Sequence, residues 1–298
     1  MKYIVIVIIC LSTVLAETGA KVGFSFLKIG VDARAAAMGD AYSSIASDAA
    51  ATYWNPAGLA RSNSPSVVLM HNAWLLDINH EFAAVQLFQG KNNIAVSLNM
   101  VSIDDIELRE TNTSQPDGSS TSNNTTIGIS YARMLKKDIC FGIQWKYLYE
   151  KYYLVSSYGF AFDIGMIKEN IFPCVNWGVS LHNIGKMSKL DRESTPLPIF
   201  IRTGVNYILP WVVFVNNPII AADLLYVVDD VLHVNFGTEL TVISKLNLRL
   251  GYIIGNESYS FTSGFGINFN RFHFSYAFVP FRYDFGQSHR ISVLIHFQ

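Results

Sequence analysis

The chain has 298 residues, of which 50% are hydrophobic, 13% are aromatic and only 15% are charged, and its formal net charge is −1. This balance contains no excess of basic residues, so nucleic acid is not an expected partner. A chain rich in aromatic residues fits either a soluble β-protein with a large core or a barrel whose outer surface meets lipid.

The first sixteen residues have the pattern of a secretory leader. Lys2 precedes an apolar run at 3–11, and Val14 and Ala16 occupy the −3 and −1 positions of a cleavage site before Glu17. The run is too short to cross a bilayer as a helix. We therefore predict a signal peptide at 1–16 and export of the remainder.

Residues 17–64 differ from the rest of the chain because the stretch 30–51 is rich in alanine and other small residues. This composition predicts a partly helical segment with Asp32 and Asp48 as candidate N-caps. Small side chains permit close packing, so the segment is expected to form a hatch or plug inside a barrel.

The hatch segment ends in the motif Trp54-Asn55-Pro56-Ala57-Gly58, in which Pro56 should stop a helix and Gly58 should permit a turn. Two interpretations are open. The motif either closes or gates a lumen, or it is a turn that joins the plug to the barrel. Trp54 correspondingly either anchors the plug or lines a hydrophobic passage.

From residue 65 to residue 298 the pattern has period two, which predicts strands. The last strand shows it clearly, with Ile291, Val293, Ile295 and Phe297 on one face. The alternation predicts about fourteen strands, near 66–73, 81–89, 93–103, 124–134, 138–149, 157–167, 174–184, 199–209, 218–227, 232–243, 246–254, 259–269, 271–279 and 287–298.

The lengths of the connections alternate along the chain. Short turns are expected at 90–92, 135–137, 168–170, 244–245 and 270, and longer loops at 104–123, 185–198 and 280–286, with 210–217 as a departure. The part at 108–124 is polar and low in complexity and is expected to be exposed. Many strands have about ten residues, enough to cross a bilayer when tilted. An all-β, transmembrane antiparallel barrel with both termini in the periplasm is the expected fold.

Several polar residues fall on inward positions of these strands. They are Lys146, Asp163, Asn176, His182, Arg202, Asn206, Glu239 and Arg249. They would form either a polar lumen or solute path, or charge pairs that stabilise a closed barrel, and the cost of burying an unpaired charge favours the second.

Metal and catalytic sites are not expected. Asp104, Asp105, Glu107 and Glu110 supply carboxylates, but without the glycine and the alternation of a calcium loop. Cys140 and Cys174 either form a disulfide or stay as free thiols, and neither has metal-site spacing. No Ser/His/Asp set is evident on neighbouring strands, so the chain is not expected to be an enzyme or to carry a cofactor.

The stretches 23–48 and 53–60, together with the ending at 284–292, resemble the PorV/PorQ family of the wider FadL-like superfamily of outer-membrane barrels. The resemblance implies a fourteen-stranded barrel with an N-terminal hatch, located in the bacterial outer membrane. Asn55-Pro56-Ala57 matches the Asn-Pro-Ala motif near the end of the FadL hatch.

The resemblance implies two functions. The leading one is an accessory component of type IX-like protein secretion, with a large translocon protein, secreted cargo and outer-membrane lipid as partners. The alternative is transport of long-chain fatty acids or other hydrophobic compounds. A structural barrel without a transport role is a third reading.

Overall fold

The computed structural model describes residues 23–75, 78–89, 91–109, 111, 115–190, 193–211, 216–228 and 232–297. The predicted signal peptide at 1–16 lies outside these residues, as do Glu110 and the side chain of Asp105. Among the described residues, no helix is long and apolar enough to cross a membrane.

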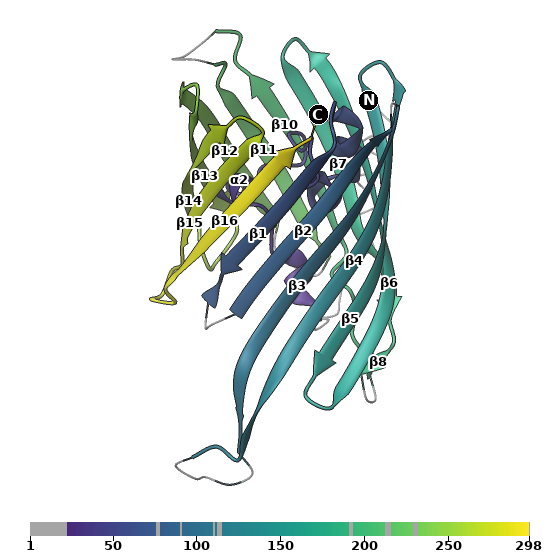
Figure 1. Ribbon diagram of the computed structural model, residues 1–298, viewed down its shortest axis with the longest axis vertical. Coiled ribbons are helices and arrows are strands. Elements are labelled where there is room, and N and C mark those ends of the chain that lie inside the picture. The colour runs from purple at the N-terminus through teal and green to yellow at the C-terminus, as the bar shows by residue number, and fades with distance from the viewer. Residues whose placement is uncertain are drawn as a thin grey trace.

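Fourteen strands form one closed antiparallel barrel, in which each strand pairs with its neighbours along the chain and β1 closes the cylinder by pairing with β16. This confirms the predicted fold and strand number (Figure 1). The strands are β1 (Ser66–Ala73), β2 (Ile78–Gln89), β3 (Asn92–Leu108), β4 (Gly118–Lys136), β5 (Ile139–Tyr152), β6 (Val155–Phe172), β7 (Val175–Met187), β10 (Phe200–Ile208), β11 (Ile219–Val227), β12 (His233–Ile243), β13 (Leu246–Ile254), β14 (Phe261–Phe269), β15 (Phe272–Pro280) and β16 (Gln287–His296). The connection from β7 to β10 holds a separate two-stranded sheet of β8 (Lys189–Leu190) and β9 (Glu193–Ser194).

The alternation of side chains explains why these segments close into a barrel rather than a sandwich. In β5, Phe141 and Ile143 point outward and are exposed, whereas Gln144 and Lys146, on the alternate positions that follow, are buried inside. The apolar face is therefore on the outside and the small or polar face on the inside, which is the arrangement of a barrel surrounded by lipid.

Two predicted connections differ from the structure. Most of the stretch 104–123, expected to be a polar loop, belongs to β3 and β4, whose outer ends pair from Ile106↔Ser120 to Leu108↔Gly118. The β4 residues there are polar on both faces, and on β3 a bulge between Ile103 and Ile106 interrupts the alternation, so no continuous apolar pattern marks this part as strand. The turn expected at 168–170 lies at 173–174 instead, because an irregularity in the pairing of β6 with β7 extends β6 to Phe172.

We refer to the end of the barrel that holds the connection after β1 and every second connection thereafter as the mouth. The wall is uneven there. Figure 1 shows the hairpins β3–β4 and β5–β6 projecting beyond the other strands at this end. β4 has 19 residues and β6 has 18, whereas β13, β14 and β15 have 9 each.

Four short helical segments precede β1, and Figure 1 shows the hatch threading through the interior of the barrel. They are η1 (Ser25–Lys28), α2 (Ala33–Ala37), α3 (Ala51–Trp54) and η2 (Pro56–Arg61). Asp32 caps α2 by accepting a hydrogen bond from the Arg34 backbone N at 3.3 Å. Asp48 bonds the Ala50 N at 2.8 Å, but the N-cap of α3 is Ala50.

The end of the hatch is more regular than expected. α3 ends at Trp54, as Pro56 predicts, but Pro56 itself then opens the 3-10 helix η2. Gly58 lies inside η2 rather than in a turn, and a Cβ there would collide with the Ala46 backbone. Glycine is required at this position for close approach of two hatch segments.

Candidate functional site

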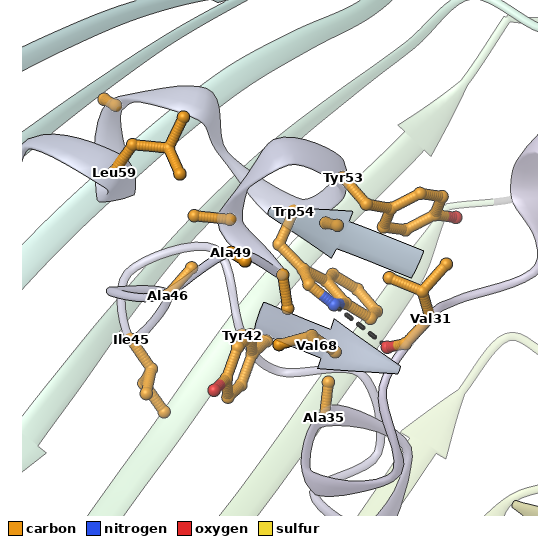
Figure 2. Packing of buried hydrophobic residues seen from close by; sticks show 14 of the residues in the cluster. Val31, Ala35, Tyr42, Ile45, Ala46, Ala49, Tyr53, Trp54, Leu59 and Val68 are labelled. Atoms are coloured by element: carbon orange, nitrogen blue, oxygen red, sulfur yellow. Dashed lines mark hydrogen bonds between the residues drawn. The ribbon is translucent and has the colours of Figure 1, made fainter. Parts of the chain in front are cut away.

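Trp54 is the centre of the hatch and is completely buried. Its indole Nε1 donates to the Val31 carbonyl at 3.1 Å, which Figure 2 shows as the dashed line. The rings of Tyr42 and Tyr53 pack against its ring in T-shaped arrangements, with centroids at 5.9 and 5.0 Å. These contacts join the first and last parts of the hatch into one packed unit.

Asn55 ties this unit to the barrel wall. Its Nδ2 donates to the carbonyls of Ser43, Met166 and Val179 at 3.1, 3.2 and 3.3 Å. Its Oδ1 accepts from the Ala57 N at 3.2 Å, which caps η2. Met166 and Val179 are paired across β6 and β7, so one buried amide links the hatch to two adjacent strands.

The wall that faces the hatch is lined with glycine. At each of these positions a Cβ would collide with hatch atoms: with Pro56 at Gly142, with Ser43 at Gly178 and with Met38 at Gly237. The set with such contacts is Gly142, Gly165, Gly178, Gly204, Gly237, Gly251 and Gly264, on β5, β6, β7, β10, β12, β13 and β14. The hatch backbone therefore lies directly against the wall, with little room for displacement.

One group of predicted inward charges links the hatch to the wall. Arg34 donates to Glu239 through Nε and Nη2 at 2.8 and 2.7 Å, and Arg249 donates to the same carboxylate through Nε at 2.6 Å. A two-pronged contact of this kind is among the stronger charge-assisted hydrogen bonds. Near it, burial raises the pKa of the Asp48 carboxyl to about 6, and the neighbouring Asp32 adds to the rise.

A second group lies wholly in the wall. Lys146 Nζ is 2.6 Å from Asp163 Oδ2, and His182 Nδ1 is 2.8 Å from the same oxygen. His182 Nε2 is in turn 2.8 Å from Ser180 Oγ. A Ser/His/Asp chain therefore does exist on neighbouring strands, contrary to the sequence reading, because a bulge at Asn183 brings β7 into register with Asp163.

The hydrogen-bonded series of Ser180, His182 and Asp163 has no room for a substrate. Ser180, His182 and Asp163 are all buried, and Ser180 Oγ lies 3.2 Å from the Trp54 carbonyl, which it bonds. A catalytic serine needs an approaching substrate atom at about 3 Å. Here the hatch occupies that space.

The other predicted inward residues also have partners. Arg202 Nη1 donates to the Asp40 carbonyl at 2.7 Å, and its guanidinium lies 4.5 Å over the Trp54 ring. Asn176 Nδ2 is 3.4 Å from Asn206 Oδ1. The structure thus brings Trp54, Asn55 and Arg202 together, but it places Lys146 with Asp163 and Glu239 with Arg249 in separate networks.

Two cavities lie on opposite sides of α2. The larger, of about 480 Å³, opens at the mouth and is lined by Ala36 and Asp40 of the hatch and by Tyr259 and Phe281 of the connections there. The smaller, of about 230 Å³, is lined by Arg34, Glu239 and residues near the opposite end, including Asn216 and Asn268.

The described residues contain no cluster of three or more His, Cys, Asp or Glu side chains that would hold a metal ion. Asp104 and Glu107 point to solvent, and Glu107 pairs with Arg109 at 2.7 Å. Cys140 and Cys174 are both free thiols, Cys140 being buried under the hatch.

Sequence reasoning missed two features of the site. The glycine lining had a visible signal, since most of the middle strands carry a glycine at an inward position. Arg290, which lines the larger cavity, also falls on the inward face of the last strand. Nothing in the spacing, however, shows that the hatch backbone lies against the glycines or that Arg290 reaches a cavity.

Comparisons with known proteins agree with this architecture. The toluene transporter TodX of Pseudomonas putida is 11% identical, with 90% of this chain and 97% of that chain covered, at a TM-score of 0.63. The CymD monoaromatic hydrocarbon channel is 13% identical, with 90% and 96% covered, at 0.58. Likeness at this identity shows the barrel fold alone. No curated protein matches the chain.

The family comparison goes further. The family model described as "Type IX secretion system protein PorV" matches residues 16–164, half of the chain. The barrel, the internal hatch and this match agree with the resemblance carried by the hatch residues. The chain is an outer-membrane β-barrel that belongs to the PorV family.

Proposed function

We propose that this barrel is an accessory component of type IX-like protein secretion that contacts the translocon or secreted cargo at its extracellular end. The observation that carries the proposal is an exposed apolar tip on a hairpin that projects past the membrane. Family membership and the packed hatch support it.

The tip of β5–β6 has the composition of a protein contact site. Tyr152, Tyr153 and Leu154 are 57%, 48% and 81% exposed, and Val155 continues the apolar run. Apolar residues clustered in water at a hairpin end are characteristic of interaction surfaces.

The length of β6 supports a position of this tip beyond the hydrocarbon layer. Of its 18 residues, about ten are enough to cross that layer when tilted. Because β6 also continues past Lys168 to Phe172 at the opposite end, only a few of the remaining residues lie on the side of the tip. At a rise of about 3.3 Å per residue and a tilt of about 45°, these residues and the turn reach about 10 Å further, which favours contact with water or a protein over contact with lipid chains.

The hatch supports a binding role rather than a conducting one. We propose that Asn55, Pro56, Ala57 and Gly58 anchor the hatch and that Trp54 holds its core together, because each contacts other hatch segments or the wall directly. The inward charges predicted from the sequence have partners of their own, so we assign them to stabilising a closed barrel. The buried Ser180 hydroxyl supports a role without catalysis.

Complementation of a deletion strain tests the proposal. Wild-type protein should restore export of secreted proteins, whereas Leu154→Asp should leave them in the periplasm even though the barrel assembles normally. Ser156→Asp is the matched control, because it adds the same charge at an exposed position two residues away. Full export with Leu154→Asp would contradict a partner site at the tip.

A second candidate function is transport of a hydrophobic compound. The larger cavity favours it, since Tyr259, Phe281, Val227 and Leu225 give it an apolar wall and its volume of about 480 Å³ is that of a small-molecule site. A ligand would have to pass α2 to reach the second cavity. Uptake of a labelled hydrophobic compound that depends on this protein would support this function.

A further inference from the structure

Two histidines meet on the inner face of the barrel at the end opposite the mouth. His273 lies on β15 opposite Leu294 of β16, and His296 follows Leu294 on the same face of β16. Figure 1 shows this end of β16 on the side of the barrel away from the projecting hairpins. The two ring centroids are 5.2 Å apart, and the ring planes are nearly perpendicular at 87°. The last hairpin of the barrel therefore brings two imidazoles together.

The Nδ1 atom of each ring has an oxygen partner. His273 Nδ1 lies 2.8 Å from Oδ1 of Asn268, its direct neighbour across the β14–β15 pair. His296 Nδ1 lies 3.3 Å from Oγ of Ser64, which precedes β1 at the end of the hatch. An amide oxygen can only accept a hydrogen bond, and a hydroxyl oxygen can also accept one. With the proton on Nδ1, each ring keeps a lone pair on Nε2.

The Nε2 atoms are open to a ligand. Neither forms a hydrogen bond among the described residues, whereas the buried His182 uses both of its ring nitrogens. His273 and His296 both line a groove that opens at this end of the barrel. Arg271 lines the same groove, but its guanidinium lies 5.5 Å over the Phe272 ring and bonds neither imidazole. The groove therefore presents two imidazole lone pairs.

The cations in the adjoining cavity are balanced by carboxylates. His273 also lines the smaller cavity, in which Arg34 and Arg249 both donate to Glu239, at 2.8 and 2.6 Å through their Nε atoms. Asp32 and Asp48 line the same cavity and add two further carboxyl groups. These groups offset the repulsion that the two arginines would exert on a metal ion beside His273.

The separation of the two rings suits one shared metal ion. Zinc lies about 2.0–2.1 Å from a histidine nitrogen, so two imidazoles on one tetrahedral ion place their ring centroids about 5 Å apart. The observed 5.2 Å agrees, and perpendicular planes are compatible because each ring can turn about its bond to the metal. Metal-binding histidines generally have the second ring nitrogen hydrogen-bonded, which fixes the tautomer and the orientation of the ring. Asn268 and Ser64 supply this support.

We propose that His273 and His296 form a binding site for a divalent transition-metal ion such as Zn²⁺, with water at the remaining coordination positions. Imidazole nitrogen suits zinc, copper and nickel, whereas calcium and magnesium take oxygen ligands. The two ligands lie on the last two strands, and Ser64 adjoins β1, which closes the barrel against β16. A bound ion should therefore strengthen the end of the barrel where the first and last strands meet. The site is independent of the proposed secretion function.

Calorimetric titration of the purified full-length barrel in nanodiscs tests the inference, after a chelator has removed bound metal. Wild-type protein should bind Zn²⁺ saturably and Mg²⁺ not at all, with empty nanodiscs as the blank. His273→Ala and His296→Ala should each weaken Zn²⁺ binding by about tenfold or more, as should Asn268→Ala, because loss of a supporting hydrogen bond costs about 10- to 100-fold in metal affinity. His71→Ala is the control and should leave binding unchanged, since His71 is an exposed histidine that pairs with Glu81 at 2.5 Å.

Chemical modification of the wild type gives a second readout that needs no variant. Diethyl pyrocarbonate reacts with free imidazole nitrogens, and peptide mass spectrometry reports each histidine separately. Zn²⁺ should protect His273 and His296 and leave His71 reactive. The midpoint of heat-induced unfolding on gels should also rise with Zn²⁺, because a ligand that binds only the folded state stabilises it. Absence of saturable Zn²⁺ binding, binding that survives replacement of both histidines, or failure of Zn²⁺ to protect them in the wild type would overturn the inference.

Discussion

Replacing Asn55 with alanine should loosen the hatch without unfolding the barrel. The change removes three donor contacts, to Ser43, Met166 and Val179, at 3.1–3.3 Å, and one acceptor contact to Ala57. At about 1 kcal/mol net for each buried hydrogen bond, and less for long ones, the docked hatch loses about 2–3 kcal/mol. Its transient opening should become about 30- to 150-fold more frequent.

Cys140 reports this opening directly, because its free thiol is completely buried in the cluster that the hatch covers. Maleimide labelling of folded protein, read by mass spectrometry of the Cys140 peptide, should accelerate by that factor in Asn55→Ala. Asn176→Ala is the matched control, since Asn176 is a buried wall amide that bonds Asn206 and Asn170 rather than the hatch. Unchanged labelling, or an equal rise in the control, would refute the anchoring role.

Three further predictions concern the wall and the hatch charges. Gly178→Val should displace the hatch, because even its Cβ would lie 2.5 Å from a hatch carbonyl, and overpacking of this kind costs about 1–3 kcal/mol. Maleimide labelling of Cys140 should therefore be faster than in the control Gly118→Ala, and equal rates in the two variants would argue against a hatch packed on Gly178. Lys146→Met should lower the midpoint of heat-induced unfolding on gels, because it leaves the Asp163 carboxylate buried without its cationic partner, at a cost of about 3–5 kcal/mol. Adding Asp163→Leu should restore much of the lost stability, and a double variant as unstable as Lys146→Met would contradict a paired charge. Because burial raises the pKa of Asp48 to about 6 from an unfolded value near 3.8, the free energy of unfolding should fall as pH rises through that window. Asp48→Asn should flatten this dependence on pH and add at most about 3 kcal/mol of stability at neutral pH. The same pH dependence in wild type and variant would count against a buried Asp48 carboxyl.

The sequence predicts the barrel well because lipid imposes a strict rule on each strand. The alternation around Phe141 and Gln144 survives in the structure, since outward residues must be apolar and inward ones small or polar. Above the membrane that rule no longer applies. The outer half of β4 is polar on both faces and a bulge interrupts the alternation of β3, so pairing rather than patterning determines their length.

The site was less predictable because it depends on which distant residues meet. The motif around Asn55 could be identified, but its contacts with Met166 and Val179 arise from barrel closure. The chain from Asp163 through His182 to Ser180 depends on a bulge in β7 that the alternation does not reveal.

The central claim is that the barrel acts by holding a protein partner at its projecting hairpin. The most direct measurement is affinity purification of tagged wild-type and Leu154→Asp protein from gently solubilised outer membranes, with proteins and lipids both identified by mass spectrometry. The account predicts that a large outer-membrane translocon or secreted proteins co-purify in stoichiometric amounts with the wild type and are lost with the variant. Recovery of a lone barrel that carries a hydrophobic molecule would contradict it.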